Sequence, residues 1–363
     1  MKRAIFLAKK ARGWTNPNPL VGAIVVKDGR IIGEGYHERY GQLHAERNAL
    51  ANCKESPEGA TIYVTLEPCC HYGKTPPCTQ AIIENKLKKV VIGSFDPNPK
   101  VDGGGIKILR EHGIEVETEC LKEECDKLND IFFYFIKHQK PYVALKYAMT
   151  MDGKIATIDG ESQWITGEKA RAYVQHLRHE YAGIMVGIGT VLGDNPMLTA
   201  RIENGNHPTR IVCDSKLKIP LESQLVKTAK DIPTMIATLK NVDIEKENKL
   251  KEAGCQVIHL PEKNGHISME QLIVELGKKN IDSVLVEGGG IVNGTLVKEH
   301  LVQKVYAFIA PKLFGGKDAK TPIEGSGIGA IKEALKLEPP KVQMLGNDIL
   351  LESKVIDKCL QES

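Results

Sequence analysis

The sequence lacks any large excess of charge of one sign. Lys and Arg together number 49 and Asp and Glu number 46, which leaves a formal net charge of +3 over 363 residues. A protein that binds a large nucleic acid or an acidic membrane through its charge normally carries a strongly basic surface. We therefore expect no nucleic acid and no membrane among its partners.

Long hydrophobic runs are missing as well. The uncharged run at residues 182–193 contains four glycines, and it is shorter than the ~18–20 apolar residues of a membrane-spanning helix. The apolar stretch Ala4–Ala8 near the N-terminus has only five residues between basic ones, which is too short for the core of a secretory signal. These features favour a cytoplasmic protein.

Cysteine is too scattered for a disulfide framework. The nine cysteines are an odd number spread over a long chain, whereas disulfide-rich domains are small, secreted and usually carry an even number. We expect reduced thiols. Any group of cysteines is therefore a candidate metal site.

The chain is longer than a single hydrophobic core usually allows, because cores stop growing at about 250–300 residues. With 42% hydrophobic and 26% charged residues, its composition is that of a globular protein and excludes disordered, collagen-like and coiled-coil chains. Pro141 breaks a helix that we expect over residues 121–139. We place the domain boundary there, which gives domains of residues 1–140 and 141–363.

Both halves alternate strands with helices. In the first half, residues 20–36 favour a hairpin, because Asp28-Gly29 accepts the positive φ values of a tight turn. Helices are expected from His44 and from Cys78, with a strand between them. The second half alternates in the same way up to a strand at residues 283–286. This order predicts two α/β domains with largely parallel sheets.

One histidine and two cysteines in the first half have the pattern of a catalytic zinc site. His44 opens a helix, and Cys69 and Cys78 bracket a loop after the next strand. Three protein ligands leave the fourth tetrahedral position of zinc to water, whereas a structural site normally uses four. Zinc lowers the pKa of that water toward ~7, and Glu46, two residues after His44, is placed to move its protons. The sequence predicts one Zn²⁺ per chain, with Glu46 as the catalytic acid and base.

An alternative makes the zinc structural, with Cys70 as a fourth ligand. That arrangement leaves Glu46 without a role. The two interpretations differ in what Glu46→Gln should do, because the substitution would abolish an enzyme and spare a structural protein.

The His-x-Glu pattern at 44–46, followed by Pro68-Cys69, is the mark of zinc-dependent nucleobase deaminases. Here the second cysteine comes nine residues after the first rather than three, because residues 71–77 are inserted. The inserted motif P-C-C-H-x-G-x-T-P-P-C, together with N-P-N-P-L-V-G at residues 16–22, resembles the bifunctional deaminase-reductases of riboflavin biosynthesis. The resemblance implies an α/β protein of two domains, an N-terminal cytidine-deaminase-like α/β/α sandwich and a C-terminal dihydrofolate-reductase-like α/β domain.

The resemblance also implies two reactions. The first domain would deaminate 2,5-diamino-6-(5-phosphoribosylamino)pyrimidin-4(3H)-one, and the second would use NADPH to reduce the ribosyl group of 5-amino-6-(5-phosphoribosylamino)uracil to ribityl. By the same match, six residues line the deaminase pocket: Asn18, His37, His71, Lys74, Asp96 and Asn98. Asn18 suits a pyrimidine edge, and His37 and Lys74 suit a ribose phosphate. Taken singly, Asn and Asp beside Pro also begin turns that bind nothing.

A glycine turn follows the strand at residues 283–286. Gly288-Gly289-Gly290 leads into a helix, an arrangement in which backbone N–H groups can hold a phosphate. The dinucleotide fingerprint G-x-G-x-x-G fails at Asn293, which disfavours a Rossmann domain. On these residues alone, a tight turn without a ligand is an equally good interpretation.

The resemblance extends to the second domain and implies two sets of contacts there. NADPH would contact Ala148, Trp164, Thr190, Asp194, Ser215, Gly289, Gly290, Ile291, Val292, Asn293, Gly294 and Thr295, and the substrate would contact Ser162, Arg178, Leu198, Arg201 and Glu287. Arg178 and Arg201 suit a phosphate because guanidinium binds it bidentately. Ser215 is a candidate seat for the 2′-phosphate of NADPH, and Asp152 is either a proton donor or a turn residue.

A different enzyme, a tRNA or free-base deaminase whose second domain binds RNA, is the main rival. It predicts a basic stripe with interleaved aromatic residues in the second half, and the charge there is evenly mixed. We expect the partner to be a small phosphoribosyl pyrimidine and the protein to be a homo-oligomer.

Overall fold

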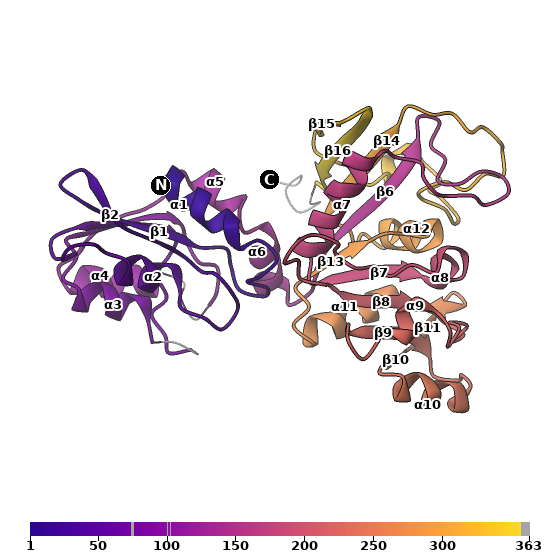
Figure 1. The fold of residues 1–363 in the computed structure, drawn as a ribbon, viewed down its shortest axis with the longest axis horizontal. Helices are drawn as coiled ribbons and strands as arrows, with labels where there is room; N and C mark the ends of the chain where they lie inside the picture. The colour runs from indigo at the N-terminus through magenta and orange to yellow at the C-terminus, as the bar shows by residue number, and fades with distance from the viewer. Residues whose placement is uncertain (74–75, 100, 102, 357–363) are drawn as a thin grey trace. The chain divides into compact units, whose positions relative to one another are not determined.

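The computed structural model describes residues 1–73, 76–99, 101 and 103–356. The chain divides into two compact units, Met1–Gln139 and a second that begins at Lys140. Figure 1 shows each unit as a sheet with helices packed on it.

The sheet of the first unit has the strand order β2-β1-β3-β4-β5. Strand β1 pairs antiparallel with β2 and β3, while β3, β4 and β5 are parallel. The sheet is therefore mixed. Its strands are β1 (Gly22–Lys27), β2 (Arg30–Tyr36), β3 (Thr61–Leu66), β4 (Lys89–Ser94) and β5 (Glu115–Glu117).

The hairpin between β1 and β2 forms as the sequence predicts. Lys27 pairs with Arg30 across a two-residue turn, and Asp28 and Gly29 both have positive φ, at 48° and 75°. These values match the type I′ turn that Asp-Gly favours between twisted strands. The hairpin ends one edge of the sheet.

Helices cover both faces of this sheet, which gives the expected α/β/α sandwich (Figure 1). One layer contains α2, α3 and α4, and the other contains α1, α5 and α6. The core between them is aliphatic, with Ile62, Ile82 and Ile92 fully buried. The bounds are α1 (Lys2–Ala8), α2 (Ala45–Ala51), α3 (Cys78–Glu84), α4 (Gly104–Glu111), α5 (Lys122–Asp126) and α6 (Asp130–His138), with a short 3₁₀ helix at Lys9–Ala11.

The single helix expected over residues 121–139 is wrong, because the structure has two helices there, α5 and α6. Asn129 lies between them with non-helical backbone angles. Its amide bonds the backbone of Leu20 twice, accepting from the N–H at 2.8 Å and donating to the carbonyl at 3.0 Å. This long-range pair competes with the helical conformation and interrupts the helix.

The second unit has a nine-stranded sheet in the order β10-β9-β8-β7-β13-β6-β14-β16-β15. It is parallel from β10 to β14, and β16 and β15 add an antiparallel edge. Its strands are β6 (Tyr142–Thr150), β7 (Gly183–Gly187), β8 (Thr209–Cys213), β9 (Thr234–Leu239), β10 (Gln256–Leu260), β13 (Ser283–Val286), β14 (Lys304–Ala310), β15 (Lys341–Leu345) and β16 (Asp348–Lys354), and β11 (Glu262–Lys263) and β12 (His266–Ile267) form a separate hairpin.

Helices and loops join these strands, and buried Val, Ile and Leu side chains fill two clusters against the sheet. The helices are α7 (Glu168–Glu180), α8 (Ile188–Asp194), α9 (Gln224–Lys227), α10 (Ile244–Glu252), α11 (Met269–Lys278) and α12 (Gly290–Lys298), with a 3₁₀ turn at Ile331–Glu333. None of the helices in the described ranges combines the length and hydropathy that crossing a membrane requires.

Candidate active sites

Three side chains of the first unit converge as metal ligands would. His44 caps the N-terminus of α2, Cys69 follows β3, and Cys78 is the first residue of α3. The Nδ1 atom of His44 lies 3.5 Å from the Sγ of Cys69 and 3.4 Å from that of Cys78, and all three candidate ligand atoms lie within 4.8 Å of one another. One imidazole and two thiols are a donor set that suits zinc. In the described part of the chain, Cys70 is not a member of this group.

Backbone contacts fix the loop that carries the two cysteines. The amide of Cys78 donates to the Sγ of Cys69 at 3.4 Å, and the amide of Thr79 donates to the carbonyl of Cys69 at 3.2 Å. From α2, Arg47 donates to the carbonyls of Pro76 and Pro77 at 3.1 and 2.9 Å. The hydrogen bond from Cys78 and the neighbouring His44 lower the pKa of the Cys69 thiol, which favours the thiolate that a metal requires.

Glu46 lies in the first turn of α2 and is only 3% exposed. Burial, together with the nearby Cys69, raises the pKa of its carboxyl to about 7. A divalent cation bound to His44, Cys69 and Cys78 would lower the pKa of Glu46, because a nearby positive charge favours the charged carboxylate. A carboxyl in such surroundings can both accept and return a proton near neutral pH.

Asn18 and His37 form a hydrogen-bonded pair beside this group. The Nε2 atom of His37 lies 3.2 Å from the Nδ2 of Asn18, and its Nδ1 lies 3.1 Å from the carbonyl of Leu43. A carbonyl only accepts, so Nδ1 carries the proton and Nε2 accepts from the Asn18 amide. Burial lowers the pKa of His37. Its ring packs edge-on against His44, with 5.4 Å between the ring centroids, a geometry that orients Asn18.

The remaining predicted pocket residues lie on two loops. The Nδ1 atom of His71 is buried with no hydrogen-bond partner among the described residues. Asp96 is 8% exposed, and its carboxylate accepts from the amide of Asn98 at 2.9 Å; burial raises its pKa to about 6. Lys74 lies outside the described residues.

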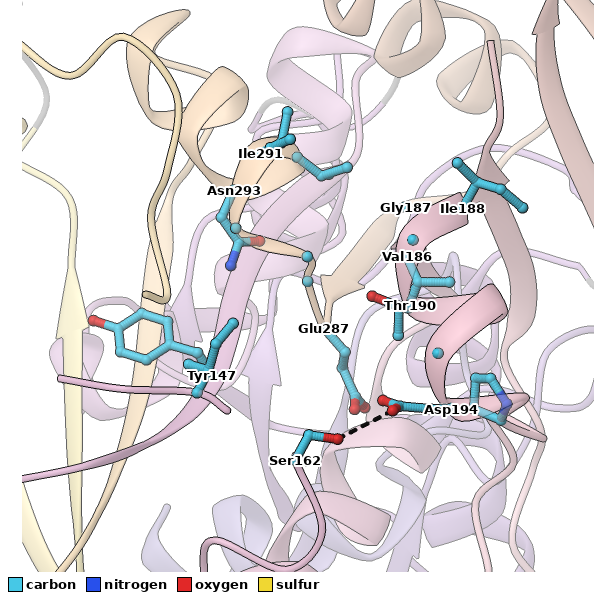
Figure 2. A pocket seen from close by; sticks show the side chains of 18 of the residues that line it. Tyr147, Ser162, Val186, Gly187, Ile188, Thr190, Asp194, Glu287, Ile291 and Asn293 are labelled. Atoms are coloured by element: carbon cyan, nitrogen blue, oxygen red, sulfur yellow. Dashed lines mark hydrogen bonds between the residues drawn. The ribbon is translucent and has the colours of Figure 1, made fainter. Parts of the chain in front are cut away.

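The second unit contains a cavity of about 1070 Å³ at the carboxyl ends of its parallel strands, where α/β sheets usually bind ligands. Sixteen of the seventeen residues predicted there line it, and Gly294 is the exception. Figure 2 shows strands and helix ends converging on it, with Thr190 and Asp194 on one side and Asn293 on another. The sixteen predicted residues that line the cavity are Ala148, Trp164, Thr190, Asp194, Ser215, Gly289, Gly290, Ile291, Val292, Asn293, Thr295, Ser162, Arg178, Leu198, Arg201 and Glu287.

The glycine turn forms part of this cavity. Gly288 has a φ of +107°, a conformation that favours glycine, and its carbonyl accepts from the amide of Gly187 at 2.9 Å. Helix α12 then begins at Gly290 and presents its N-terminus beside the cavity. Gly294 instead packs against the backbone of Glu324, where a side chain would collide, so the packing of α12 accounts for that glycine.

Polar side chains hold the opposite side of the cavity. Ser162 donates to the carboxylate of Asp194 at 3.0 Å (Figure 2). Ser215 lines the cavity, and its hydroxyl accepts from the amide of Ile267 at 3.1 Å. The carboxylate of Asp214, which also lines the cavity, accepts from the amide of Ile219 at 2.7 Å through Oδ2. Its other oxygen, Oδ1, is buried without a hydrogen-bond partner among the described residues.

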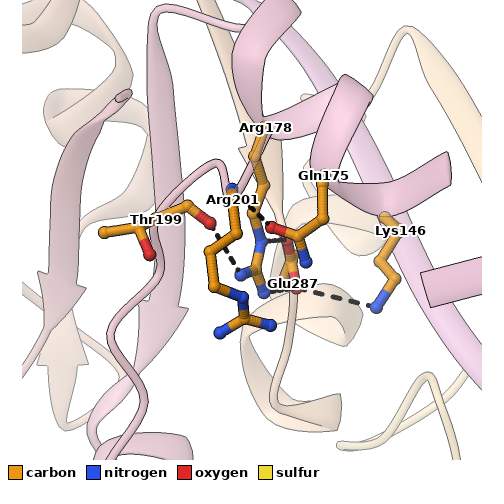
Figure 3. A network of polar contacts seen from close by, with 6 residues as sticks. All are labelled: Lys146, Gln175, Arg178, Thr199, Arg201 and Glu287. Carbon is orange, nitrogen blue, oxygen red and sulfur yellow. Dashed lines mark hydrogen bonds and ion pairs between the residues drawn. The ribbon is translucent and has the colours of Figure 1, made fainter. Parts of the chain in front are cut away.

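Glu287 is the centre of a buried ionic network (Figure 3). It pairs with both Nε and Nη2 of Arg178, at 2.7 and 2.8 Å, and lies 3.6 Å from the ammonium of Lys146. Burial alone would raise the pKa of Glu287, but the charges of Arg178 and Lys146 lower it to about 2. Arg201, in contrast, has an exposed side chain.

Asp152 lies outside the residues that line the cavity. Its carboxylate accepts from the Thr150 hydroxyl and from the amides of Phe314 and Gly315. These hydrogen bonds lower its pKa to about 2. The structure thus favours the turn interpretation of Asp152 over the proton-donor one.

Sequence reasoning missed several supporting residues. Glu67 anchors the N-terminus of α4, Arg47 holds the cysteine loop, and Gln175 accepts from the backbone of Arg201. A charged residue that directly follows an apolar strand, as Glu67 does, was a signal in the sequence. Nothing local marked Gln175.

The two units define an enzyme with two sites. A His-Cys-Cys group with a buried glutamate on an α/β/α sandwich is the site of a zinc-dependent deaminase. A cavity with a glycine turn at the carboxyl edge of a parallel sheet suits a reductase that binds a phosphorylated cofactor.

Comparisons with known proteins agree with this class. Residues 1–94 match the cytidine and deoxycytidylate deaminase zinc-binding region, and residues 141–351 match the RibD C-terminal domain. Riboflavin biosynthesis protein RibD of Actinobacillus pleuropneumoniae is 54% identical to this chain, covering 98% of it and 94% of the relative. The protein of the same name from Aquifex aeolicus is 43% identical to this chain, and the match covers 97% of this chain and 96% of the relative.

Solved structures agree as well. Acinetobacter baumannii RibD is 35% identical with a TM-score of 0.88, covering 98% of each chain. A Thermotoga maritima deaminase and reductase is 39% identical with a TM-score of 0.87, covering 98% of this chain and 97% of its own. The chain belongs to the RibD family, the bifunctional deaminase-reductases of riboflavin biosynthesis. Zinc fits the first unit and NADPH the second.

Proposed function

We propose that the first unit deaminates 2,5-diamino-6-(5-phosphoribosylamino)pyrimidin-4(3H)-one through Glu46, and that the second reduces the ribosyl group of the deaminated product. The Thermotoga maritima structure is titled as a deaminase and reductase of these substrates. The observation that carries the proposal is the convergence of His44, Cys69 and Cys78 within 4.8 Å, next to the buried Glu46.

In the deamination, the side chains of the first unit bind the substrate and move protons. Zinc held by His44, Cys69 and Cys78 supplies a water whose pKa is lowered toward ~7. Glu46 takes a proton from the water that attacks C2 of the pyrimidine and passes it to the amino group that leaves as ammonia. The burial of Glu46 keeps bulk water away from this transfer.

Substrate recognition in the first unit would use the residues around this group. The Nδ2 group of Asn18 donates to His37. The side-chain carbonyl of Asn18 can therefore accept a hydrogen bond from a pyrimidine N–H. The buried, unpartnered Nδ1 of His71 is a second group that a polar ligand would satisfy. Lys74, Asp96 and Asn98 complete the proposed set.

In the reduction, the cavity of the second unit would bind both reactants. NADPH supplies a hydride for C1′ of the ring-opened ribose. The N-terminus of α12 and the backbone from Gly289 to Asn293 suit its phosphates. Ser215, which also lines the cavity, suits its 2′-phosphate. Ser162, Arg178, Leu198, Arg201 and Glu287, which all line the cavity, would contact the phosphoribosyl pyrimidine.

The experiment that tests this function is an assay of the purified protein with the diamino substrate. Ammonia release without NADPH, followed by NADPH oxidation once it is added, is the expected result. NADPH oxidation that precedes ammonia release would contradict the order of the reactions. Ammonia release with no NADPH oxidation on either substrate would contradict the reductase assignment.

The remaining expectations concern partners and location. The balanced charge supports a protein without nucleic-acid or membrane partners and with a cytoplasmic location. A homo-oligomer is proposed on the family resemblance, and analytical ultracentrifugation of the purified protein tests it.

A further inference from the structure

The two cysteines of the zinc site lie far apart in the chain. Cys78 follows Cys69 by nine residues, where nucleobase deaminases normally have three. The free-energy cost of closing a flexible loop grows with three halves of the logarithm of its length, so tripling the spacing lowers the closed population about fivefold. Contacts outside this loop must therefore hold the ligands together.

One set of contacts joins Cys69 to the start of α3. The amide of Cys78 donates to the Sγ of Cys69 at 3.4 Å, and the amide and hydroxyl of Thr79 donate to the Cys69 carbonyl at 3.2 and 3.3 Å. These hydrogen bonds fix the two cysteines relative to each other. They do not fix either cysteine relative to His44, which precedes α2.

Arg47 makes the connection between α2 and the cysteine loop. It follows His44 by three residues, so the two side chains are neighbours on the helix. Its Nε and Nη2 donate to the carbonyls of Pro76 and Pro77 at 3.1 and 2.9 Å, and the buried Pro77 directly precedes Cys78. A guanidinium presents two donors in a fixed plane and thus suits two successive carbonyls, whereas a lysine ammonium has no such fork.

The same turn of α2 is anchored to the sheet. The Nδ2 of Asn48, the residue after Arg47, donates at 2.9 Å to the carbonyl of Tyr36, the last residue of β2. Helix α2 is therefore held on one side by the sheet, and Arg47 extends this support to the residues before Cys78. The Nδ1 of His44 and the Sγ of Cys78 lie 3.4 Å apart across this joint.

We propose that Arg47 is a positioning residue of the zinc site, which holds His44 and Cys78 at ligand spacing before the metal binds and so raises the affinity of the site for Zn²⁺. Arg47 itself contacts neither the metal nor the substrate in this role. Residues that orient metal ligands typically contribute 10–100-fold to metal affinity. The role rests on the zinc site of the proposed function and does not depend on which pyrimidine is deaminated.

The test compares three variants of the full chain. Arg47→Met removes both donors and keeps a long side chain, and Arg47→Lys retains the charge without the fork. Asn52→Ala is the matched control, because Asn52 at the end of α2 also donates to a backbone carbonyl, that of Glu34 at 3.0 Å, away from the cysteine loop. Competition for Zn²⁺ between each protein and a colorimetric chelator gives the Kd for the metal.

Arg47→Met should raise the Kd for Zn²⁺ about tenfold or more, since the empty site loses its pre-formed spacing. Arg47→Lys should raise it by a smaller factor of about three, because one donor remains. Asn52→Ala should keep it within about twofold of the wild-type value. An unchanged Kd in Arg47→Met overturns the proposal, and so does an equal rise in Asn52→Ala.

Activity at two zinc concentrations separates positioning from a role in the chemistry or in the fold. Ammonia release by Arg47→Met should fall when zinc is limiting and return to within about twofold of the wild-type kcat when zinc is saturating, because the three ligands and Glu46 are intact. NADPH oxidation on the deaminated substrate should not change. A kcat that stays tenfold low at saturating zinc overturns the proposal.

Stability is measured on the zinc-free proteins. Arg47→Met and Asn52→Ala should unfold within a few degrees of each other, so that a difference in zinc affinity reports the site and not the fold. If Arg47→Met does not fold, as judged by circular dichroism, Arg47→Gln replaces it and should also weaken zinc binding more than Asn52→Ala does. The expected order of affinities in a protein that releases no ammonia would contradict the proposed function and support the role of Arg47. A wild-type protein that binds no zinc would contradict both.

Discussion

The carboxylate of Glu67 accepts hydrogen bonds from the backbone amide of Gly105 at 3.1 Å, and also from those of Gly103 and Ile106 at 3.2 and 3.3 Å. Glu67 directly follows strand β3 and lies two residues before Cys69. The three amides lie at the start of helix α4. One buried carboxylate therefore joins the start of the cysteine loop to a helix N-terminus, where negative charge is favourable.

We expect Glu67→Gln to destabilise the first unit by about 1–3 kcal/mol, because an uncharged side chain pairs less well with three amides. Ammonia release should fall with it, since the Cys69 loop loses its support, and NADPH oxidation on the deaminated substrate should not change. Thermal unfolding with parallel assays provides the measurement. Glu58→Gln, at an exposed ion pair with Lys86, is the matched control; equal behaviour of the two variants would contradict the role of Glu67.

The metal content of two cysteine variants separates the catalytic zinc site from the structural alternative. Cys78→Ser should lose most of its zinc and its deaminase activity, because the thiolate is one of only three protein ligands. Cys70→Ser should retain about one zinc per chain, because Cys70 is not part of the ligand group in the described chain. Elemental analysis of dialysed protein measures both. Zinc loss in Cys70→Ser would restore the four-ligand alternative.

The stability of the second unit should depend on pH through Glu287. Its pKa is about 2 in the folded protein against an ordinary value of 4.5, so the unfolded state binds the proton more tightly. Its contribution is fully present above about pH 4.5 and is lost as the pH falls toward 2, an effect on the order of 3 kcal/mol.

Glu287→Gln should remove this pH dependence and lower the stability at pH 7, because Arg178 and Lys146 would be left buried without a counter-charge. Urea unfolding followed by Trp164 fluorescence, in a Trp14→Phe background, reports on the second unit. A variant that retains the steep loss of stability below pH 4.5 would show that another group causes it.

Asp152 should prove dispensable for the chemistry. Asp152→Asn should leave kcat for NADPH oxidation within about threefold, because the carboxylate serves the turn with Phe314 and Gly315 and lies outside the cavity lining. Proteolysis near residues 312–316 should become faster, since an amide holds two backbone donors less well. A loss of about a hundredfold in kcat with an intact loop would instead identify Asp152 as the proton donor.

The features that the sequence predicted are local ones. The turn at Asp28-Gly29 depends on two neighbouring residues, whose preference for positive φ is known. The zinc site was predicted from a motif of fixed residue types in a fixed order, which are His44, Glu46, Cys69 and Cys78. The family resemblance supplied the cavity residues of the second unit. Neither route needed the tertiary structure.

The features that the sequence did not predict depend on distant partners. The break between α5 and α6 comes from the contact of Asn129 with Leu20, which lies 109 positions away. The pairing of Arg178 with Glu287 spans the same separation, 109 positions, so the sequence showed two arginines suited to phosphate and could not show that one was already bonded. Propensity and spacing carry no information on such contacts.

The measurement that tests the account most directly is the pair of activities in Glu46→Gln. The account predicts that this variant binds zinc as wild type does, releases no ammonia from the diamino substrate, and oxidises NADPH at the wild-type rate when it receives the deaminated substrate. Ammonia release at the wild-type rate would contradict the role of Glu46 in deamination. Loss of both activities in a folded, zinc-loaded protein would contradict the independence of the two sites.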